Sequence, residues 1–456
     1  MTRTRPRPLP GQIRAARILL AIGLLAAIPQ LPMAIAQQVA AVADLAAPID
    51  AQLRGELSGH WYPHAIDREH GGFHQELARD WSIRPDVSKF QVYQARMTWT
   101  AAAFAEYSKD RREEYLGHAR HGLAFLDDVM RDAEHGGFHW ILDARGRLDP
   151  RLGDEKHVYG TSFVIYAASK LRAVGGDERA LKVARDAFDW LEAHAHDNRD
   201  GGYFEALRRD GTPIHGPDAA PSTGKVDRLG IPYGQKTMNS HIHMLEALAE
   251  LAKVDDRRVV RDRLAEVFAL VRDRIAAAPG LLNLYLTRDW KVIPSHDSYG
   301  HDVETAFLLV EAAEVLGEPN DPRTWKVARS LVDHALEGGW DEEHGGFYDK
   351  GDVATNRAFD LTKVWWTQAE GLNALLLMDA KYGRETDRYR RAFLMQWSFI
   401  RAHMLDPKFD GWFAETEREG DLRGDGAKAS PWKANYHTSR AMMNVVRMIR
   451  NEAAGH

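Results

Sequence analysis

A glycine–aromatic motif recurs six times along this chain of 456 residues. The steps between the leading glycines are 65, 65, 79, 65 and 66 residues. A period of this length is typical of repeat architectures, and each unit can hold two helices and their connections. We therefore predict an all-α fold, a closed (α/α)6 barrel of six helical hairpins. The motif reads His70-Gly71-Gly72-Phe73, His135-Gly136-Gly137-Phe138, Gly201-Gly202-Tyr203, the degenerate Gly280-Leu281-Leu282, His344-Gly345-Gly346-Phe347 and Asp410-Gly411-Trp412-Phe413.

Between the motifs the apolar residues follow a helical period, as at Phe163, Ile165, Tyr166 and Leu171. Alternating segments are short and follow the glycines directly, as in 137–142. We interpret them as brief β-hairpins at one end of the barrel. Paired glycines allow backbone angles that other residues avoid, so the motif itself is interpreted as structural.

The first 36 residues have the layout of a secretory signal peptide. Five arginines precede an apolar run from Ile18 to Ile28, and Ala34-Ile35-Ala36 supplies small residues before a cleavage point. The alternative is a membrane anchor, but the run is about half of the roughly 20 residues that span a bilayer. We predict cleavage, export to a periplasm, and one barrel domain over residues 37–456.

Composition excludes several classes of function. The chain has no cysteine, so thiol chemistry and cysteine-bound metals are excluded. Its net charge of −6 becomes −11 once the five leader arginines are removed (−6 − 5). So acidic a protein is a poor match for nucleic acid or for a membrane surface. We expect a small neutral ligand, and a monomer or weak homodimer.

The 79-residue step contains about 14 more residues than the 65-residue period. They fall within 208–235, a stretch that carries Pro213, Pro217, Pro221 and Pro232. Such a composition predicts a loop. We place this insertion on the rim of the barrel, where it could also serve as a lid.

Each repeat carries a polar or aromatic residue at or near the start of its second helix. These residues follow the leading glycine by 25, 23, 42, 21, 20 and 26 residues, and 42 becomes about 28 without the insertion. In a closed ring the equivalent ends of these helices meet at one mouth, so we expect one shared pocket. The residues are Arg96, Tyr159, His243, His301, Trp365 and His437.

Two of these positions belong to His-x-x-Glu pairs, His243–Glu246 and His301–Glu304. Residues three apart are neighbours on a helix, and a carboxylate raises the basicity of an imidazole beside it. A single pair is more often a surface ion pair, but two pairs in equivalent places favour proton transfer. The same side chains, with His241 and His437, could instead bind zinc or manganese. No zincin spacing is present, so we predict no metal.

Tryptophans lie beside these polar positions, at Trp365, Trp366 and Trp432. A tryptophan is usually a core residue. Several near one mouth suit stacking on a sugar ring, because the indole joins an apolar face to a polar N–H.

These residues lie in segments that together resemble the N-acylglucosamine 2-epimerase family, and most of all its cellobiose and mannobiose 2-epimerase branch. The resemblance covers nearly all of residues 37–456. It implies an (α/α)6 barrel that epimerises or isomerises sugars without a metal or organic cofactor. The segments are Gln94-Ala95-Arg96, Asn239–Glu246, Ser298–Glu304, Trp365–Glu370 and Trp432–Arg440.

The resemblance also implies roles. His301 and His437 would transfer protons, Arg96 would lie near the reacting oxygens, and Glu304 would pair with His301. Substrate contacts would come from Asn239, His243, Trp365 and Trp432, and also from Tyr159. From their places beside these residues, we also expect Glu246 and Trp366 against the substrate. Asn435 stands where a proline is common, and the 208–235 insertion is unusually long, so both bear on the choice of substrate.

We therefore expect a 2-epimerase that inverts C2 of a reducing-end glucose or mannose unit through an enediolate. An aldose–ketose isomerase acting on mannose would share that intermediate. A glycan hydrolase or lyase, and a non-catalytic carbohydrate- or protein-binding barrel, remain the other interpretations, because fold does not determine function.

Overall fold

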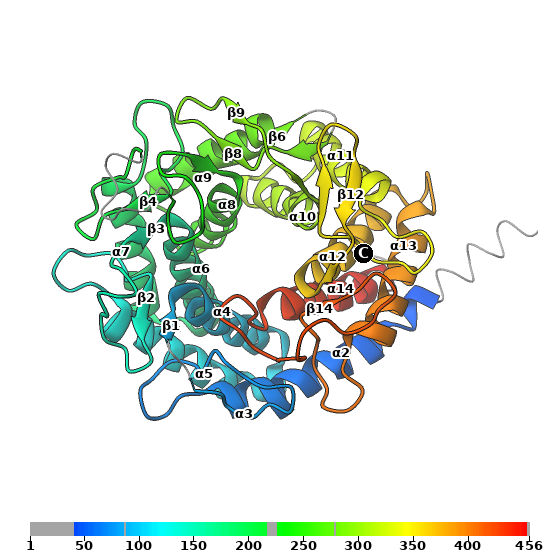
Figure 1. Cartoon of the computed structure of the whole chain (residues 1–456), viewed down its shortest axis with the longest axis horizontal. Helices are drawn as coiled ribbons and strands as arrows, with labels where there is room; N and C mark the ends of the chain where they lie inside the picture. Colours follow the sequence, from blue (N-terminus) through cyan, green and yellow to red (C-terminus); the bar gives the residue numbers. More distant parts are fainter. Residues whose placement is uncertain (1–40, 86–87, 217–225, 278–279, 454–456) are drawn as a thin grey trace, which may run out of the picture.

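Two concentric rings of helices surround one axis in the computed structural model (Figure 1). The structure describes residues 41–85, 88–216, 226–277 and 280–453, so the predicted leader at 1–36 lies outside the described residues. Within these ranges the inner ring consists of α4 (Gln91–Tyr107), α6 (Val158–Gly175), α8 (Met238–Ala252), α10 (Tyr299–Leu316), α12 (Trp365–Tyr382) and α14 (Tyr436–Ala453).

The outer ring is made of shorter, partly exposed helices, each of which precedes an inner helix in sequence. They are α2 (Ala46–Gly55) continued by η1 (Glu56–Trp61) and α3 (Tyr62–Ala65), α5 (Arg112–Phe125) continued by η3 (Leu126–Met130), α7 (Glu178–His194), α9 (Arg258–Leu270) continued by η5 (Val271–Ile275), α11 (Pro322–Gly338), and α13 (Arg388–Phe399) continued by η6 (Ile400–Met404). One outer and one inner helix form a repeat, and the predicted (α/α)6 barrel is confirmed.

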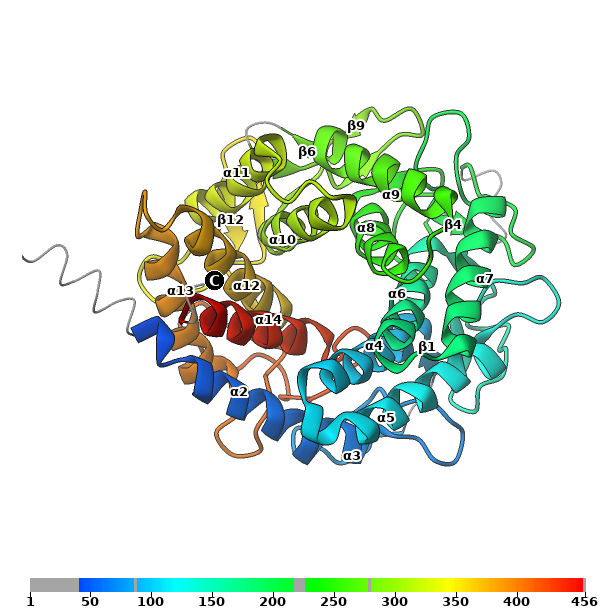
Figure 2. The ribbon, with the colours of Figure 1, turned by 180° about the vertical axis from the view of Figure 1, so that it is seen from behind.

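The two rings differ in pattern because they differ in burial. Helix α4 is buried on every side from Gln91 to Ala105. Helix α7 instead buries one stripe, which includes Ala180, Ala184 and Leu191, and faces solvent with the other. Short connections join each of the first five inner helices to the outer helix that follows it, at the far end of the barrel (Figure 2). Among the described residues, no helix combines the length and the apolar character needed to cross a bilayer.

Short antiparallel strands connect neighbouring repeats at the near end. The strand before an inner helix pairs with a strand that follows the glycine motif of the next repeat. An isolated bridge between Leu77 and Ala429 joins the last repeat to the first, so pairing continues around the ring. The pairs are β1 (Ser88–Phe90) with β2 (Ile141–Asp143), β3 (Lys156–His157) with β4 (Ala206–Leu207), β5 (Lys236–Thr237) with β8 (Tyr285–Leu286) and then β9 (Val292–Ile293), β10 (Asp297–Ser298) with β11 (Lys350–Asp352) and then β12 (Arg357–Asp360), and β13 (Lys363–Val364) with β14 (Glu415–Thr416). Within the fourth repeat, β6 (Ala276–Ala277) pairs with β7 (Leu281–Leu282).

The glycine motif makes the turn between an outer helix and these strands. Gly72 has φ of 66°, and a Cβ atom there would lie 2.5 Å from the side-chain oxygen of Gln94. Asp410 takes the place of the first glycine in the sixth repeat, with φ of 54°. Aspartate tolerates this left-handed conformation better than most residues. The structural period of the last step, from Gly345 to Asp410, is therefore 65 residues, not the 66 that the glycines alone suggest.

A buried ion pair stabilises the same turn in five repeats of the described chain. An aspartate at the end of the outer helix bonds a lysine that precedes the inner helix, and most of these lysines also donate to a backbone carbonyl of the motif. Both side chains of each pair are almost fully buried. The pairs are Asp67–Lys89 (2.7 Å), Asp132–Lys156 (2.9 Å), Asp197–Lys236 (3.0 Å), Asp341–Lys363 (3.0 Å) and Asp406–Lys428 (2.9 Å).

The insertion at 208–235 extends from the strand end of the barrel, and its residues 217–225 lie outside the described residues. Its first part turns back through a bridge between Leu207 and Pro213. Its last part carries Tyr233, whose hydroxyl donates to the carboxylate of Glu155 in the preceding repeat. The described part of the insertion therefore packs on the rim. Its use as a lid stays a prediction.

Replacing Asp132 with alanine would leave the Lys156 ammonium buried without its carboxylate. Removing one partner of a buried ion pair costs about 3–5 kcal/mol, so we expect a loss of that size in the free energy of unfolding. Urea denaturation followed by circular dichroism measures it. The matched control is Lys182→Ala in the exposed Lys182–Asp186 pair, where we expect a change below about 1 kcal/mol. Equal losses in the two variants would contradict the role of burial.

Candidate active site

A cavity of about 240 Å³ opens at the end where the inner helices begin. All six inner helices contribute to its wall, and the loop before α14 adds one tryptophan. Ten of the eleven predicted site residues line it, and Glu246 lies directly beneath. The lining residues are Arg96, Tyr159, Asn239, His243, His301, Glu304, Trp365, Trp366, Trp432 and His437.

Two of the cavity histidines are held by carboxylates at Nδ1. His243 Nδ1 lies 2.6 Å from Glu246 Oε1, as its spacing predicts. His437 Nδ1 lies 2.8 Å from Glu370 Oε1 on α12, a partner that the sequence reasoning missed. Each contact fixes the ring and leaves Nε2 as the nitrogen available to a ligand.

His301 has a different partner from the one expected. Its Nδ1 lies 2.7 Å from the hydroxyl of Ser298, one turn earlier. The predicted pairing of His301 with Glu304 is therefore wrong, because the carboxylate of Glu304 instead accepts a hydrogen bond of 2.6 Å from Arg440. Glu304 Oε1 also lies 3.7 Å from His437 Nδ1, so this residue serves the other histidine.

Arg440 is the cation that joins the carboxylates under the cavity. Its guanidinium donates to Glu246 (2.6 Å), Glu304 (2.6 Å) and Glu370 (2.7 Å), which come from three different inner helices. The Tyr436 hydroxyl donates to Glu246 as well, at 2.6 Å. The sequence signal for Arg440 was its position three residues after His437, on the same face of α14.

Burial keeps the cavity imidazoles neutral. Desolvation lowers the pKa of His243 and of His301 to about 3, and that of His437 well below its usual range. A pKa near neutral suits a histidine that both gives and takes a proton, and burial places the pKa of these rings well below that value. Desolvation also raises the pKa of Glu246 and Glu370 above the usual value for a glutamate. Three neutral imidazoles therefore face the cavity at pH 7.

Arg96 brings a fixed positive charge to the part of the cavity wall that α4 supplies. Its guanidinium donates to the Tyr159 hydroxyl at 2.9 Å and to the Trp432 carbonyl at 3.4 Å. It also packs over the rings of Phe163 and Tyr436, with distances of 4.5 and 5.2 Å to the ring centres. These contacts hold the guanidinium without neutralising it, because none of these partners is a carboxylate.

The three predicted tryptophans differ in position. Trp366 lies between the two predicted proton-transfer histidines, with ring-centre distances of 4.7 Å to His301 and 5.7 Å to His437. Trp365 is half-buried beside it. Trp432 is 43% exposed and packs edge-on against Phe90, so it offers a free indole face at the edge of the cavity.

The possible metal ligands are mostly engaged otherwise. His241 lies outside the cavity wall, where its Nδ1 is 2.7 Å from the Thr237 carbonyl and its Nε2 accepts from the Tyr203 N–H. Donor atoms of Glu304, Glu370 and His437 lie within 4.8 Å of one another. The Arg440 guanidinium, which bonds both of those carboxylates, already supplies the positive charge there.

The barrel and its cavity define a carbohydrate epimerase or isomerase. The family model for N-acylglucosamine 2-epimerase (GlcNAc 2-epimerase) matches residues 71–441, and the chain belongs to that family. It is 31% identical to a cellobiose 2-epimerase of Bacteroides fragilis, over 87% of this chain and 97% of the relative. It is 26% identical to a D-mannose isomerase of Marinomonas mediterranea, over 84% of this chain and 93% of the relative. The solved cellobiose 2-epimerase of Spirochaeta thermophila superposes with a TM-score of 0.77 at 30% identity, covering 90% of this chain and 98% of that one.

A pH titration of the cavity histidines tests their burial. We expect the side-chain ¹⁵N shifts of His243 and His301 to show neutral rings from pH 8 down to pH 5, whereas histidine in an unfolded chain titrates near pH 6.5. Because the folded-state pKa values lie below that of the unfolded chain, the unfolded state binds more protons at acid pH. Their contribution to stability is complete above about pH 6.5 and is lost as the pH falls towards 3. Rings that titrate near pH 6.5 in the folded protein would contradict the assignment.

Proposed function

We propose that this protein is a 2-epimerase that interconverts the glucose and mannose configurations at the reducing end of a disaccharide such as cellobiose or mannobiose. The observation that carries the proposal is one cavity in which three neutral imidazoles, a guanidinium and three indoles converge. Membership of the family supports the reaction class, and the cellobiose 2-epimerase names of its relatives support the substrate class.

In the proposed reaction the sugar ring opens and one histidine removes the C2 proton. The electron pair of the C–H bond moves into a C1–C2 double bond, which gives an enediolate. The second histidine takes up a proton from solvent, delivers it to the opposite face of C2 and inverts the centre. The first histidine releases the proton taken from C2 to solvent, so the protons balance over the cycle. His301 and His437 stand on α10 and α14, which lie on either side of α12 in the inner ring (Figure 1). That separation suits groups that act on two faces.

The charges around the cavity support this chemistry. Neutral imidazoles are ready to accept a proton, and Glu370 and Glu304 stabilise the imidazolium that then forms on His437. Arg96 supplies a fixed positive charge for the enediolate oxygens, because its partners are a hydroxyl, a carbonyl and aromatic faces. The cavity lies at the N-terminal ends of the six inner helices, where the helix dipoles also favour negative charge.

The same cavity argues against hydrolysis. A glycosidase needs two carboxyl groups about 5–10 Å apart on either side of the glycosidic bond. Among the described residues that line the cavity, Glu304 is the one carboxylate, and Arg440 is bonded to it. A binding barrel would use the tryptophans but has no need for two oriented imidazoles. An aldose–ketose isomerase is the second candidate, favoured by the D-mannose isomerase among the relatives.

Proton exchange at C2 in heavy water tests the mechanism. We expect His301→Asn and His437→Asn each to slow deuterium incorporation by about 10²–10⁴-fold, the usual contribution of a general acid–base group. The matched control is His241→Gln, because Gln94 and Gln368 hold the equivalent place in two other repeats and make the same contact with the motif. We expect this control to keep its exchange rate. Normal exchange in both asparagine variants would remove the two histidines from the mechanism.

The edge position of Trp432 predicts a role in binding the second sugar ring. We expect Trp432→Ala to raise KM for cellobiose about 3- to 10-fold, the effect of losing one aromatic contact, while KM for mannose changes less. Separate incubations with cellobiose, mannobiose and mannose, with products identified as epimer, ketose or cleavage fragments, provide the measurement. A ketose formed from mannose, with disaccharides left intact, would instead establish the isomerase.

A further inference from the structure

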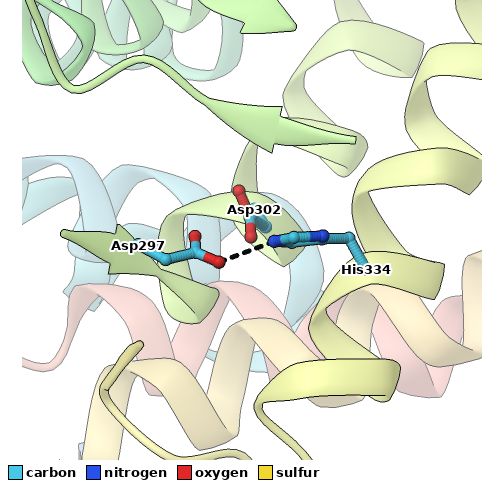
Figure 3. Close-up of side chains that lie close together, drawn as sticks. All are labelled: Asp297, Asp302 and His334. Carbon is cyan, nitrogen blue, oxygen red and sulfur yellow. Dashed lines mark hydrogen bonds and ion pairs between the residues drawn. The ribbon is translucent and has the colours of Figure 1, made fainter. Parts of the chain in front are cut away.

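The fourth repeat replaces the buried Asp–Lys pair with a different cluster. Its glycine motif is the degenerate one, and Asp297 stands where Lys156, Lys236 and Lys363 begin the strand before an inner helix. Asp297 meets Asp302 on α10 and His334 on α11, and Figure 3 shows the three side chains converging. Asp297 and Asp302 are fully buried, and His334 is 6% exposed.

The cluster holds two carboxyl groups and one imidazole. His334 Nε2 lies 2.6 Å from Asp297 Oδ2, which is a hydrogen bond. The second oxygen of Asp297 and both oxygens of Asp302 are buried, and among the described residues they have no hydrogen-bond partner of good geometry. One donor atom from each of the three residues lies within 4.8 Å of the others. Two buried carboxylates so close together need either a proton or a metal ion between them.

The geometry favours the proton. Two ligands of one tetrahedral zinc ion, each about 2.0–2.2 Å from the metal, lie about 3.3 Å apart. The contact between His334 and Asp297 is too short for that arrangement. A proton on Asp302 makes this residue a donor to the free oxygen of Asp297. The group then carries one negative and one positive charge at most, as each Asp–Lys pair does.

The surroundings of Asp302 agree with a neutral acid. The titratable groups that face it are Asp297 on β10, His334 on α11 through Asp297, and Tyr299 on α10 itself, and β7 presents the backbone N–H of Leu282. Burial and the charge of Asp297 raise the pKa of Asp302 well above its usual range.

The cluster also surrounds the start of α10, where His301 stands. Asp297 directly precedes Ser298, whose hydroxyl holds His301 Nδ1, and Asp302 directly follows His301. His334 belongs to the outer helix α11, so the cluster joins the outer helix to the first turn of the inner one. In the other five repeats the ion pair with lysine instead joins the start of the inner helix to the outer helix of the same repeat, whereas α11 is the outer helix of the fifth repeat.

We propose that Asp297, Asp302 and His334 are positioning residues for His301, and that a proton shared by the two carboxyl groups fixes the first turn of α10 so that His301 presents Nε2 to the cavity. The proposal rests on the proposed function for its link to catalysis. Its structural part, the shared proton, stands separately.

Variants at Asp302 separate positioning from simple stability. Asp302→Ala removes the donor and leaves Asp297 without it, so we expect kcat to fall about 10- to 100-fold with KM nearly unchanged, as for a misplaced catalytic group. Asp302→Asn supplies a neutral N–H donor of the same shape, and we expect it to restore kcat to within about threefold of the wild type. The control is Leu331→Ala, which opens a buried site one turn before His334 on the same helix α11 and leaves the three polar side chains of the cluster unchanged. We expect it to lose stability but to keep kcat below its unfolding temperature.

Two measurements test the shared proton without using activity. Infrared spectroscopy at neutral pH should show the carbonyl band of a protonated carboxylic acid in the difference between the spectra of the wild type and Asp302→Asn, because subtraction cancels the bands of other buried acids. Because the folded-state pKa of Asp302 exceeds that of the unfolded chain, this group's contribution to stability decreases as the pH rises between the two values. Asp302→Asn should remove that decrease.

Three results would overturn the proposal. One is a metal ion bound at one per chain in the wild type and lost in Asp302→Asn, as measured by elemental analysis. Another is the absence of the acid band. The third is equal kcat in Asp302→Ala and Leu331→Ala. If His301→Asn keeps full C2 exchange, the proposed function fails, whereas the infrared band and the pH dependence of stability still decide the shared proton.

Discussion

The buried ion pair between an aspartate and a lysine is the interaction on which the barrel's working end depends. It joins the end of an outer helix to the strand that starts the next inner helix, as in Asp132–Lys156 and Asp341–Lys363. Two buried charges stabilise a fold only when their geometry is good and their other hydrogen bonds are made. The lysines meet that condition by bonding carbonyls of the glycine motif as well. The pair therefore fixes the direction in which each inner helix begins.

Beneath the cavity, buried and paired charges again connect helices, but the residues are an arginine and three glutamates. Arg440 bonds three glutamates from three inner helices, and two of these carboxylates lie close to His437. Because these charged groups lie beneath the neutral imidazoles, His437 can accept a proton without a large change in solvation. The carboxylates that stabilise the resulting imidazolium are already in place. The same contacts tie α8, α10, α12 and α14 together at one depth. Chemistry and barrel stability therefore use the same side chains.

The architecture could be predicted because the spacing of the glycines repeats, and the residues of the cavity could be gathered because equivalent helix starts meet in a closed ring. The hydrogen-bond partners of the cavity histidines could not be predicted from the spacing. Glu370 and Ser298 hold the histidines through contacts that depend on helix rotation, and Glu304 was assigned to the wrong histidine because Arg440 attracts its carboxylate. A sequence signal did exist for the ion pairs, since Lys89 and Lys363 precede their inner helices at the same place. The roles of the cavity residues stay predictions.

The pairing of strands between neighbouring repeats has a consequence for how the substrate specificity of such an enzyme can evolve. The long loop after β4 belongs to the third repeat, but β4 pairs with β3, which leads directly into the helix that carries Tyr159 in the second repeat. Tyr233 strengthens that link through Glu155. A change of loop length in one unit is thus transmitted to the pocket wall supplied by the unit before it. Selection acting on surface loops can in this way reshape the interior while every inner helix keeps its sequence.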